Sequence, residues 1–318
     1  MNRSDRKIFE LTDVQLAYLL GRNEELYLGG NATHFYVEHD TKIDLKHFEE
    51  ALNLVIEHQP MLRTIILPDG KQEELAKVAR YEIPVTDLSN LLEEEKSRII
   101  DEVREKISHR QFEIGKWPMF AFSAYKMDDS VTRIVMDFDM MIIDRYSIEI
   151  LIMELNHYYH NPESKLEPIE YSFSKYIEEK KSYLLEKKQR DEAFWMDKIE
   201  DLPMGPDVPV NANVESGNRF AYKEVILKKD TWDRIKNNLQ ERRVLPSVFL
   251  LVCYGKMLAK WSNQPYMTIN MTTANRKMQK HIYNDIIGDF TELLLVDLDF
   301  RDGKTIYDVC VETQKKIS

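Results

Sequence analysis

The chain has 318 residues, more than one hydrophobic core usually serves, so its length predicts two domains or lobes. Hydrophobic residues make up 43% and charged residues 31% of the sequence, the balance of an ordinary soluble protein. The net charge of −11 argues against a nucleic-acid-binding surface and leaves protein partners open.

The first half of the chain alternates between helical and strand-like patterns. Apolar residues at helical spacing predict helices, and strict alternation predicts strands. In chain order we predict a helix over 11–22, a strand over 33–40, a helix over 44–60, a strand over 61–72, a helix over 91–112, paired strands over 118–129 and 130–139, and a helix over 147–160. The apolar residues expected to face inward in the last helix are Ile148, Leu151, Ile152, Leu155 and Tyr159.

The second half begins after the polar segment "NPESKLEP" (161–168), which we interpret as the first lobe boundary. In chain order we predict a long polar helix over 172–199, a linker over 202–218 with three prolines and two glycines, a strand over 220–227, helices over 230–241 and 246–261, strands over 266–272 and 291–299, and the start of a helix over 304–318. The predicted fold class is α/β, with an N-terminal lobe over 1–165 and part of a second lobe over 166–318 that includes a linker over 200–218.

The stretch "MDFDMMIIDRYS" (136–147) carries acidic residues on both sides of an apolar run. Asp137 and Asp139 share one face of the predicted strand, and Asp139 stands at its end, where loops often carry chemistry. Asp144 lies just ahead of the next helix. Ser147 is placed to cap that helix, because its hydroxyl can accept a hydrogen bond from an unpaired amide.

Several interpretations of this stretch stay open. Ser147 could be only a helix cap, and Asp144 a helix-start residue favoured by the macrodipole. Asp137 and Asp139 form a DxD pair, which occurs at metal-bound nucleotide-sugar sites but is also common by chance, and the run lacks the ligands of a calcium-binding loop. The carboxylates could instead be structural, and a buried one then needs a partner, for which Arg63 is the candidate.

Two cysteines, Cys253 and Cys310, are too few for a disulfide framework or a zinc quartet. The eight histidines form no spaced ligand set, and no phosphate-loop motif occurs, so we expect no metal. The first residues lack the apolar core of a signal peptide, and the longest apolar runs are shorter than a membrane span. These features predict a cytoplasmic protein that makes no membrane contact.

The segment "DMMIIDRYS" (139–147) has the form D-x-x-x-x-D-x-x-S. It resembles the signature of heterocyclization (cyclization) domains of nonribosomal peptide synthetases, in the condensation-domain superfamily, where it replaces the His-His motif of ordinary condensation domains. Further segments resemble other motifs of this family in the same order: "LTDVQLAYLLGR" (11–22), "HQPMLRTIILPDGKQ" (58–72), "FEIGKWPMF" (112–120), "FWMDKIEDLPMGPDVPV" (194–210), "LPSVFLLVCYGKMLAKWS" (245–262), "TINMTTANR" (268–276) and "IGDFTELLLVDLD" (287–299). The resemblance therefore covers nearly the whole chain.

The resemblance implies a fold like that of chloramphenicol acetyltransferase. Two related α/β lobes would form a V with a tunnel between them. The family's domain continues past the position of Ser318, and the later motifs, including a Thr and an Asp thought to support cyclodehydration, are absent from residues 1–318. We therefore expect the second lobe to be incomplete in this chain.

The resemblance also implies an activity and its partners. An aminoacyl or peptidyl thioester on an upstream peptidyl carrier protein would meet Cys, Ser or Thr on a downstream carrier protein. The new peptide bond would then be cyclised and dehydrated to a thiazoline or oxazoline. The substrates would be carried on the 4'-phosphopantetheine of the carrier proteins, with no cofactor bound directly, and an adenylation domain of the same assembly line would be a further partner.

By the same resemblance, Asp139, Asp144 and Ser147 are candidate catalytic residues. A carboxyl group with a raised pKa in a dry tunnel could take a proton from a thiol or hydroxyl, or deliver one to a leaving oxygen. Asp144 is also predicted to pair with Arg63, as the corresponding Asp of condensation domains pairs with an Arg. The candidates for lining the tunnel or binding substrate are Asn270, Thr272, Asn275, Asp289 and Thr291.

A hypothesis from a different class is a non-catalytic docking platform for carrier proteins with the condensation-domain fold. The intact D-x-x-x-x-D argues against a decayed enzyme. An acyltransferase of the same fold with a His-His motif is excluded, since "HHxxxD" does not occur in the sequence.

Overall fold

The computed structural model describes residues 6–26, 29–209, 223–278 and 281–317. The chain divides into two compact units: unit 1 holds Met1–Leu185 and Ala274–Thr291, and unit 2 holds Glu186–Thr273 and Glu292–Ser318. This division differs from the predicted boundary at 165/166. The reason is that the first turns of α5 (Phe173–Lys198) bury Phe173 and Tyr176 in the core of unit 1.

Unit 1 contains a four-stranded sheet in the order β2 (His34–Thr41), β7 (Thr132–Asp139), β6 (Phe120–Lys126) and β5 (Val85–Asp87). β7 pairs antiparallel with both β2 and β6, which confirms the predicted strand pair, while β5 lies parallel to β6. In this register Phe138 of β7 lies between Phe35 of β2 and Phe120 of β6. The central strand β7 is buried along most of its length.

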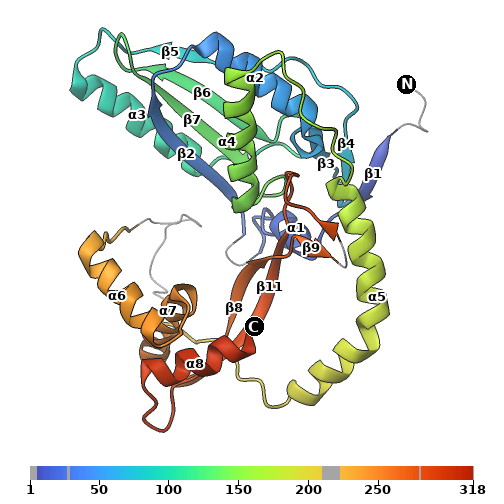
Figure 1. The fold of residues 1–318 in the computed structure, drawn as a ribbon, viewed down its shortest axis with the longest axis vertical. Helices are drawn as coiled ribbons and strands as arrows, with labels where there is room; N and C mark the ends of the chain where they lie inside the picture. Colours follow the sequence, from blue (N-terminus) through green and yellow to red (C-terminus); the bar gives the residue numbers. More distant parts are fainter. Residues whose placement is uncertain (1–5, 27–28, 210–222, 279–280, 318) are drawn as a thin grey trace. The chain divides into compact units, whose positions relative to one another are not determined.

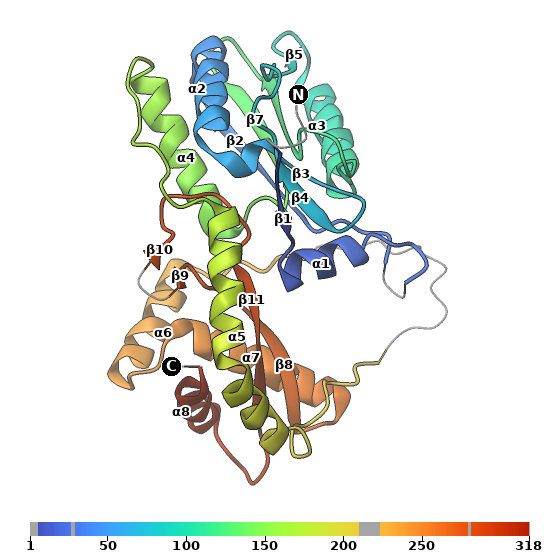
Figure 2. The same cartoon turned by 90° about the vertical axis from the view of Figure 1, so that its right-hand side faces the viewer.

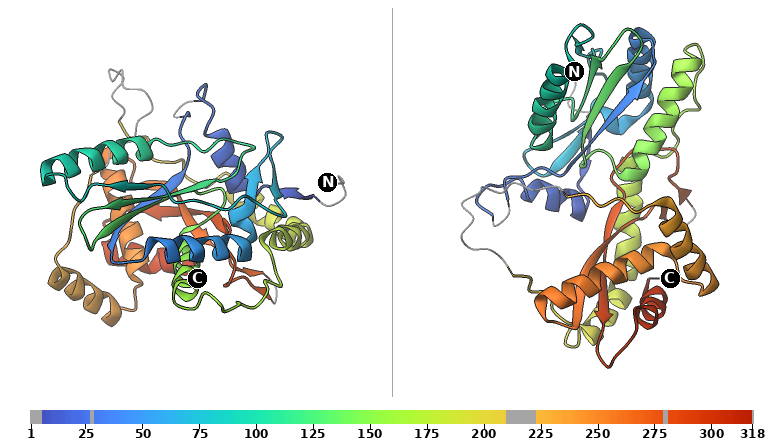
Figure 3. Two further views of the ribbon diagram at one scale, coloured as in Figure 1. Left: turned by 90° about the horizontal axis from the view of Figure 1, so that it is seen from above. Right: turned by 90° about the vertical axis from the view of Figure 1, so that its left-hand side faces the viewer.

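Helices cover both faces of this sheet. α2 (Leu45–His58) and α4 (Arg145–His160) lie on one face and α3 (Glu93–Ser108) on the other (Figures 1 and 3). The Phe48 ring of α2 packs against Phe122 of β6, with ring centroids 6.2 Å apart. Because β7 is sandwiched in this way, side chains on both of its faces are buried, including the acidic ones at its end.

A second sheet of unit 1 has the order β1 (Lys7–Glu10), β4 (Lys71–Glu74) and β3 (Thr64–Ile66), and α1 (Asp13–Leu20) follows β1 (Figure 2). The predicted single strand over 61–72 is in fact a 3-10 turn, Pro60–Arg63, followed by the hairpin of β3 and β4. The hairpin turns at Gly70, whose φ of 78° is in the left-handed region. Strands β1 and β5 were not predicted, because each is short and carries no clear alternation.

The buried face of α4 is broader than the predicted one. Ile148, Leu151 and Leu155 are buried as predicted, but Ile152 is 47% exposed, and Tyr158 is buried more deeply than Tyr159. The helix also buries Ile150 and Glu154, which shows that a second surface of α4 is covered. A single-stripe pattern does not anticipate two neighbours on different sides of one helix.

Unit 2 contains a two-stranded sheet of β8 (Tyr266–Ala274) and β11 (Thr291–Asp299), with α6 (Lys229–Glu241), α7 (Pro246–Ser262) and α8 (Ile306–Lys316). α7 packs closely on the sheet, since a Cβ at Gly255 would lie 2.2 Å from the Leu298 side chain. Of the predicted strand 220–227, residues 223–227 have no regular structure, and 220–222 lie outside the described residues. The linker is irregular over 202–209, and its remainder also lies outside them.

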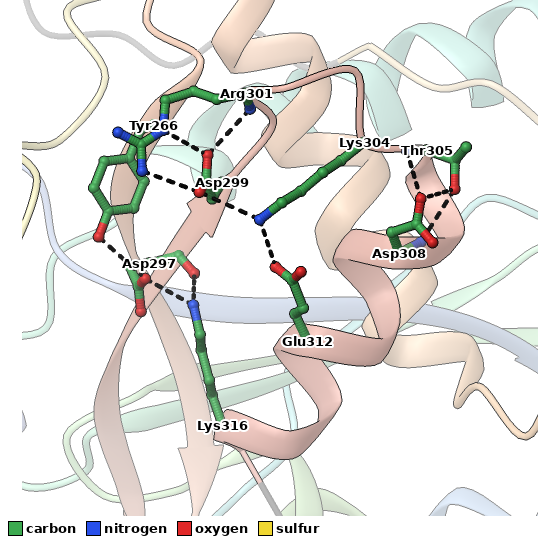
Figure 4. A network of polar contacts seen from close by, with 9 residues as sticks. All are labelled: Tyr266, Asp297, Asp299, Arg301, Lys304, Thr305, Asp308, Glu312 and Lys316. Atoms are coloured by element: carbon green, nitrogen blue, oxygen red, sulfur yellow. Dashed lines mark hydrogen bonds and ion pairs between the residues drawn. The ribbon is translucent and has the colours of Figure 1, made fainter.

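Charged side chains tie α8 to the end of β11 in unit 2 (Figure 4). Asp299 receives hydrogen bonds from Arg301 at 2.8 Å and from Lys304 at 3.3 Å, and Lys304 also reaches Glu312 of α8 at 2.9 Å. Lys316 lies 2.7 Å from Asp297. These ion pairs hold α8 against the end of β11. None of the charged side chains in this network is an obvious reacting group.

The remaining short strands of unit 1 are β9 (Lys277–Met278) and β10 (His281–Ile282), which pair antiparallel. The mixed α/β class is confirmed, whereas the V-shaped arrangement and its tunnel stay predictions. Within the described ranges no single helix has the length and apolar composition to cross a membrane; α6 and α7 meet that test only jointly, as a pair bent by 106°.

Candidate active site

The signature loop, residues 139–147, connects the end of β7 to the first turn of α4 and lies entirely in unit 1. Its apolar centre is packed inward, since Met141, Ile142 and Ile143 are fully buried. Gln15 of α1 donates a hydrogen bond from Nε2 to the carbonyl oxygen of Met141 at 2.6 Å. The prediction that the apolar run packs inward is confirmed, and the loop carries a carboxyl group into the interior at each end.

Asp139 ends β7 and is 0% exposed. Its Oδ2 pairs with the guanidinium group of Arg22, and its Oδ1 accepts a hydrogen bond from the Met141 amide at 3.1 Å. Arg22 also donates from Nη1 to the carbonyl oxygen of Phe112 at 3.0 Å. Burial raises the pKa of Asp139, and the charge of Arg22 opposes this shift. Both carboxyl oxygens are engaged, so this end of the loop is fastened to the segment that follows α1.

Asp144 is the N-cap of α4 and is 4% exposed. Its Oδ1 accepts a hydrogen bond from the Ser147 amide at 2.7 Å, and its Oδ2 accepts one from the Phe290 amide at 3.2 Å. The Asp144 amide donates to the carbonyl oxygen of Gly288 at 3.0 Å. The prediction of Ser147 as the cap is therefore wrong: α4 begins at Arg145, two residues earlier than predicted, and the cap moves to Asp144 with it.

The Ser147 hydroxyl bridges α4 and the backbone of Gly288. It donates to the Gly288 carbonyl oxygen at 2.9 Å and accepts from the Gly288 amide at 3.0 Å. It also accepts a hydrogen bond from Nη2 of Arg276 at 2.6 Å. Ser147 is fully buried, so its hydroxyl holds two chain segments together and is not open to a substrate.

Arg276 is the cation at the Asp144 end of the loop. Its Nη2 lies 2.7 Å from Oδ1 of Asp144, and its Nη1 donates to two backbone carbonyls within 283–286, at 2.8 and 2.9 Å. The guanidinium carbon lies 4.2 Å from the centroid of the Phe290 ring. The planar fork of an arginine suits this set of acceptors, which a lysine could not satisfy at once.

The predicted pairing of Arg63 with Asp144 is wrong. Arg63 donates from Nη1 to the carbonyl oxygens of Ile56 and Glu57 at 2.6 and 2.5 Å, and its Nη2 lies 3.7 Å from Oε1 of Glu74. The 3-10 turn that contains Arg63 directly follows α2. The side chain therefore folds back over the last turn of that helix, where unpaired carbonyl groups attract a cation.

Gly288 is needed for a close approach and not for a turn. Its backbone does not adopt the left-handed conformation, but a Cβ added to it would lie 2.4 Å from the Phe173 ring. The Phe173 ring also contacts Phe290, with centroids 5.1 Å apart. Gly288 thus allows a close contact between α5 and the 287–291 segment.

A second set of contacts fixes the segment before Gly288. Gln59, after α2, donates from Nε2 to Glu154 at 2.6 Å and to the carbonyl oxygen of Asp285 at 3.0 Å, and its Oε1 accepts from the Ile287 amide at 2.9 Å. Glu154 of α4 also lies 3.0 Å from Nδ1 of His58. The "HQP" motif therefore acts by holding this distant segment against α4.

Asp137 lies on the same face of β7 as Asp139, and the charge of Asp139 acts on it, but the two carboxyl groups have different cations. It is 1% exposed, and Arg110 lies 3.1 Å from its Oδ2, whereas Asp139 has Arg22. Burial raises the pKa of Asp137 to about 7, and the charge of Arg110 opposes that shift. In the part of the chain that the structure describes, no group of three or more His, Cys, Asp or Glu side chains could hold a metal ion.

The remaining candidates fall in both units. Asn275 donates its backbone amide to the carbonyl oxygen of Phe290 at 3.0 Å, and Asp289 and Thr291 follow Gly288, so these three lie near the Asp144 end of the loop. Asn270 and Thr272 belong to unit 2, where both are exposed on β8. Their role in binding a substrate stays a prediction.

Sequence reasoning missed Arg22, Gln15 and the pairing role of Arg276. Arg22 and Gln15 both occur in the quoted segment 11–22, and the alternation of the strand placed Asp139 at its end without indicating that it is buried. A search for every cation in the family-like segments would have included Arg22 and Arg276 beside Arg63. Choosing among them requires the packing of α1 and of 274–291 against the loop.

The family model for the condensation domain matches residues 7–318, so the chain belongs to the condensation-domain family. The family suspected from the sequence is thereby confirmed. Bacitracin synthase 1 of Bacillus licheniformis is 33% identical to the chain over 304 residues, which is 95% of the chain and 6% of that protein. Phenyloxazoline synthase MbtB of Mycobacterium sp. (strain MCS) is 28% identical over 93% of the chain and 25% of that protein.

Among solved structures, the EpoB nonribosomal peptide synthetase cyclization-docking bidomain from Sorangium cellulosum is similar, with a TM-score of 0.85 and 29% identity. The likeness covers 98% of the chain and 62% of that bidomain. The chain therefore spans less than two thirds of each of these relatives.

Proposed function

We propose that this chain carries out condensation and heterocyclization. It would join a carrier-bound aminoacyl or peptidyl thioester to Cys, Ser or Thr on a second carrier protein and close a thiazoline or oxazoline ring. The proposal rests on the D-x-x-x-x-D-x-x-S loop, which is intact and is held in place by hydrogen bonds and ion pairs of its two aspartates. The chain that carries this loop is similar to a cyclization domain along nearly its whole length.

The chemistry sets the tasks of the site. The acceptor amine attacks the thioester carbon, and the carrier thiol leaves with a proton. The thiol or hydroxyl of the acceptor side chain then adds to the new amide carbon, and the former carbonyl oxygen leaves as water. Within this scheme we assign Asp139, Asp144 and Ser147 a positioning role, because each is buried and hydrogen-bonded to other parts of unit 1.

The partners follow from the reaction. The donor and acceptor would arrive on the 4'-phosphopantetheine arms of an upstream and a downstream peptidyl carrier protein, supplied by an adenylation domain of the same assembly line. No group bound permanently to this chain is needed for amide formation or for loss of water. We propose that the chain works in the cytoplasm, where these carriers are loaded.

The test uses the natural polypeptide that carries residues 1–318, together with a donor thioester carrier and a cysteinyl carrier protein. Mass spectrometry of the released product should show a species lighter by one water than the linear amide. An alanyl carrier is the matched control, because it can accept the acyl group but has no nucleophile for ring closure. Linear amide from both carriers would reject heterocyclization and leave condensation.

A docking platform without chemistry is the second candidate, favoured by the fact that both signature carboxyl groups are already paired with arginines. It predicts that both carrier proteins bind while neither linear nor cyclised product forms. Binding measured by titration calorimetry beside the product assay separates the two proposals.

A further inference from the structure

A cavity of about 230 Å³ lies in unit 1, between α3 and the face of the four-stranded sheet that α3 covers (Figures 1 and 3). On the sheet side its wall contains small side chains, since Ala121 of β6 stands directly opposite Asp137 of β7, and Ser123 stands opposite Val135. These small side chains leave room beneath the helix. The residues of α3 that line the cavity are Val103, Lys106 and Ile107.

Asp137 is the buried charged group of this cavity. It is 1% exposed, and neither Oδ1 nor Oδ2 has a hydrogen-bond partner among the residues that the structure describes. Arg110 lies 3.1 Å from Oδ2 without the geometry of a hydrogen bond, and Nδ1 of His34 lies 3.7 Å from Oδ1, beyond hydrogen-bond distance. A buried carboxyl group that lacks donors is costly, so the cavity favours an occupant that supplies them.

Two cations line the more exposed part of the same cavity. The Arg110 side chain, directly after α3, is 28% exposed, and Lys106 in the last turn of α3 is exposed. A different ion pair beneath α3 is complete, because Arg104 donates to both carboxyl oxygens of Glu38 at 2.6 and 2.8 Å. The Asp137–Arg110 pair has no such fit, so the carboxylate keeps free acceptors and the guanidinium group keeps donors for a ligand.

A ligand that satisfies both side chains needs a group with several N–H donors and, close to it, an anion. A free α-amino acid has both, because its ammonium and carboxylate groups are joined through one carbon atom. The ammonium group offers three donors to the two oxygens of Asp137, and the carboxylate can accept bidentate hydrogen bonds from Arg110. The cavity has the volume of roughly seven water molecules, so the amino acid must be small. Its side chain would meet the apolar walls formed by Val103, Ile107 and Val135.

We propose that the cavity beneath α3 binds one free α-amino acid with a small apolar side chain, with its ammonium group on Asp137 and its carboxylate on Arg110. The ligand replaces the direct contact between these two side chains by one contact to each. It thereby ties the end of α3 to the central strand β7. The site is separate from the signature loop, and the inference goes beyond the proposed function, because no bond is made or broken in it.

The first experiment measures hydrogen exchange by mass spectrometry in the natural polypeptide that carries residues 1–318, with L-valine as the probe. Peptides that cover 93–110 report on α3 and Arg110, so an amino-acid site elsewhere in the polypeptide does not affect the readout. At ten times its dissociation constant, valine should slow exchange through local opening of this segment about tenfold. Unchanged exchange up to the solubility limit of valine would overturn the inference and indicate a cavity that holds only water.

The second experiment separates the two charges of the ligand. Isobutylamine keeps the ammonium group of valine and lacks its carboxylate, while isovalerate keeps the carboxylate and lacks the ammonium group. Each should need at least about tenfold higher concentration than valine for the same protection, because each loses its charge-assisted hydrogen bonds to one of the two side chains. Protection by either compound at the same concentration as valine would show a site for a single charge and would reject the amino acid.

The third experiment uses variants. Asp137→Asn keeps the size of the side chain and should remove the protection by valine. Ala121→Leu fills the cavity while keeping both charges, so it should remove the protection even if Asp137→Asn fails to fold. Glu38→Gln is the matched control, since it breaks the pair with Arg104 beneath the same helix without changing the cavity, and valine should still protect it.

The outcomes of the variant experiment decide the inference without any product assay. Protection retained in Ala121→Leu, or in a folded Asp137→Asn, would place the valine site elsewhere and overturn the inference. Protection lost in Glu38→Gln as well would mean that valine responds to the fit of α3 as a whole, which also contradicts a site on Asp137. None of these results depends on ring closure, so they leave the proposed function to its own test.

Discussion

Each end of the signature loop buries a carboxylate, and the two ends compensate its charge with different sets of hydrogen-bond donors. Asp139 has one arginine and one backbone amide as donors, whereas Asp144 has one arginine and two backbone amides. Arg22 serves one carboxylate and one carbonyl, while Arg276 serves Asp144, Ser147 and two carbonyls and stacks on an aromatic ring. More chain segments meet at Asp144 than at Asp139, so replacing Asp144 should destabilise a larger part of unit 1.

The comparison teaches that two carboxylates of one motif, equally buried, need not form a functional pair. Each has its own cation, and these cations come from opposite ends of the sequence. A buried charge that loses its partner is costly, so both ends are expected to be stability determinants before they are catalytic ones.

The largest effect is expected at the Asp144 end. Asp144→Ala should lower the free energy of unfolding by about 3–5 kcal/mol, because it strands the charge of Arg276. Urea denaturation with a double-mutant cycle measures the coupling, which should be at least about 1 kcal/mol between Asp144 and Arg276. The same cycle with Arg63 should give a coupling near zero, and a large value there would restore the original pairing.

A somewhat smaller effect is expected at the Asp139 end. Asp139→Ala should cost about 3 kcal/mol, since Arg22 keeps one carbonyl partner but loses its counter-charge. The double variant with Arg22→Met should recover part of the loss. A wild-type melting curve for Asp139→Ala would show that Arg22 finds another partner.

Gly288→Ala sharpens the comparison without touching a charge. The added methyl group must displace the Phe173 ring, which should cost about 1–3 kcal/mol at the Asp144 end only. Phe173→Leu in the same chain should relieve part of the clash. Gly205→Ala is the control, since its Cβ would meet its nearest atom at 3.8 Å, and its unfolding curve should stay close to that of wild type.

The smallest effect is a pH dependence at the edge of the Asp144 end. The hydrogen bond with Glu154 raises the pKa of His58 above its usual 6.5, and burial opposes this shift. The stabilisation is therefore fully present below about pH 6.5 and is lost as the pH rises through the higher folded-state pKa. His58→Gln and Glu154→Gln should each flatten the dependence of Tm on pH in that window. An unchanged slope in both would place the pH response elsewhere.

The fold was predictable where the signal is local. The spacing of apolar residues located α2, α3, α4, α6 and α7 to within a few residues, and the alternation in 130–139 placed Asp139 at the end of a strand. The short strands β1 and β5 could not be recognised, since each gains its stability from pairing with a strand distant in the sequence. The first residue of α4 could not be located from the sequence either. The helix begins two residues earlier than predicted, which moves the cap from Ser147 to Asp144.

The sequence by itself determined that the signature loop has an apolar centre with an acidic residue at each end, and that either carboxylate needs a partner if it is buried. Only the tertiary structure decided which cations these partners are. Asp139 and Arg22 lie 117 residues apart and Asp144 and Arg276 lie 132 apart, so no local pattern links them. Arg63 is closer in sequence, but the carbonyl groups at the end of α2 engage it first. An ion pair depends on where packing brings two charges within a few ångströms, and that distance is a property of the folded chain.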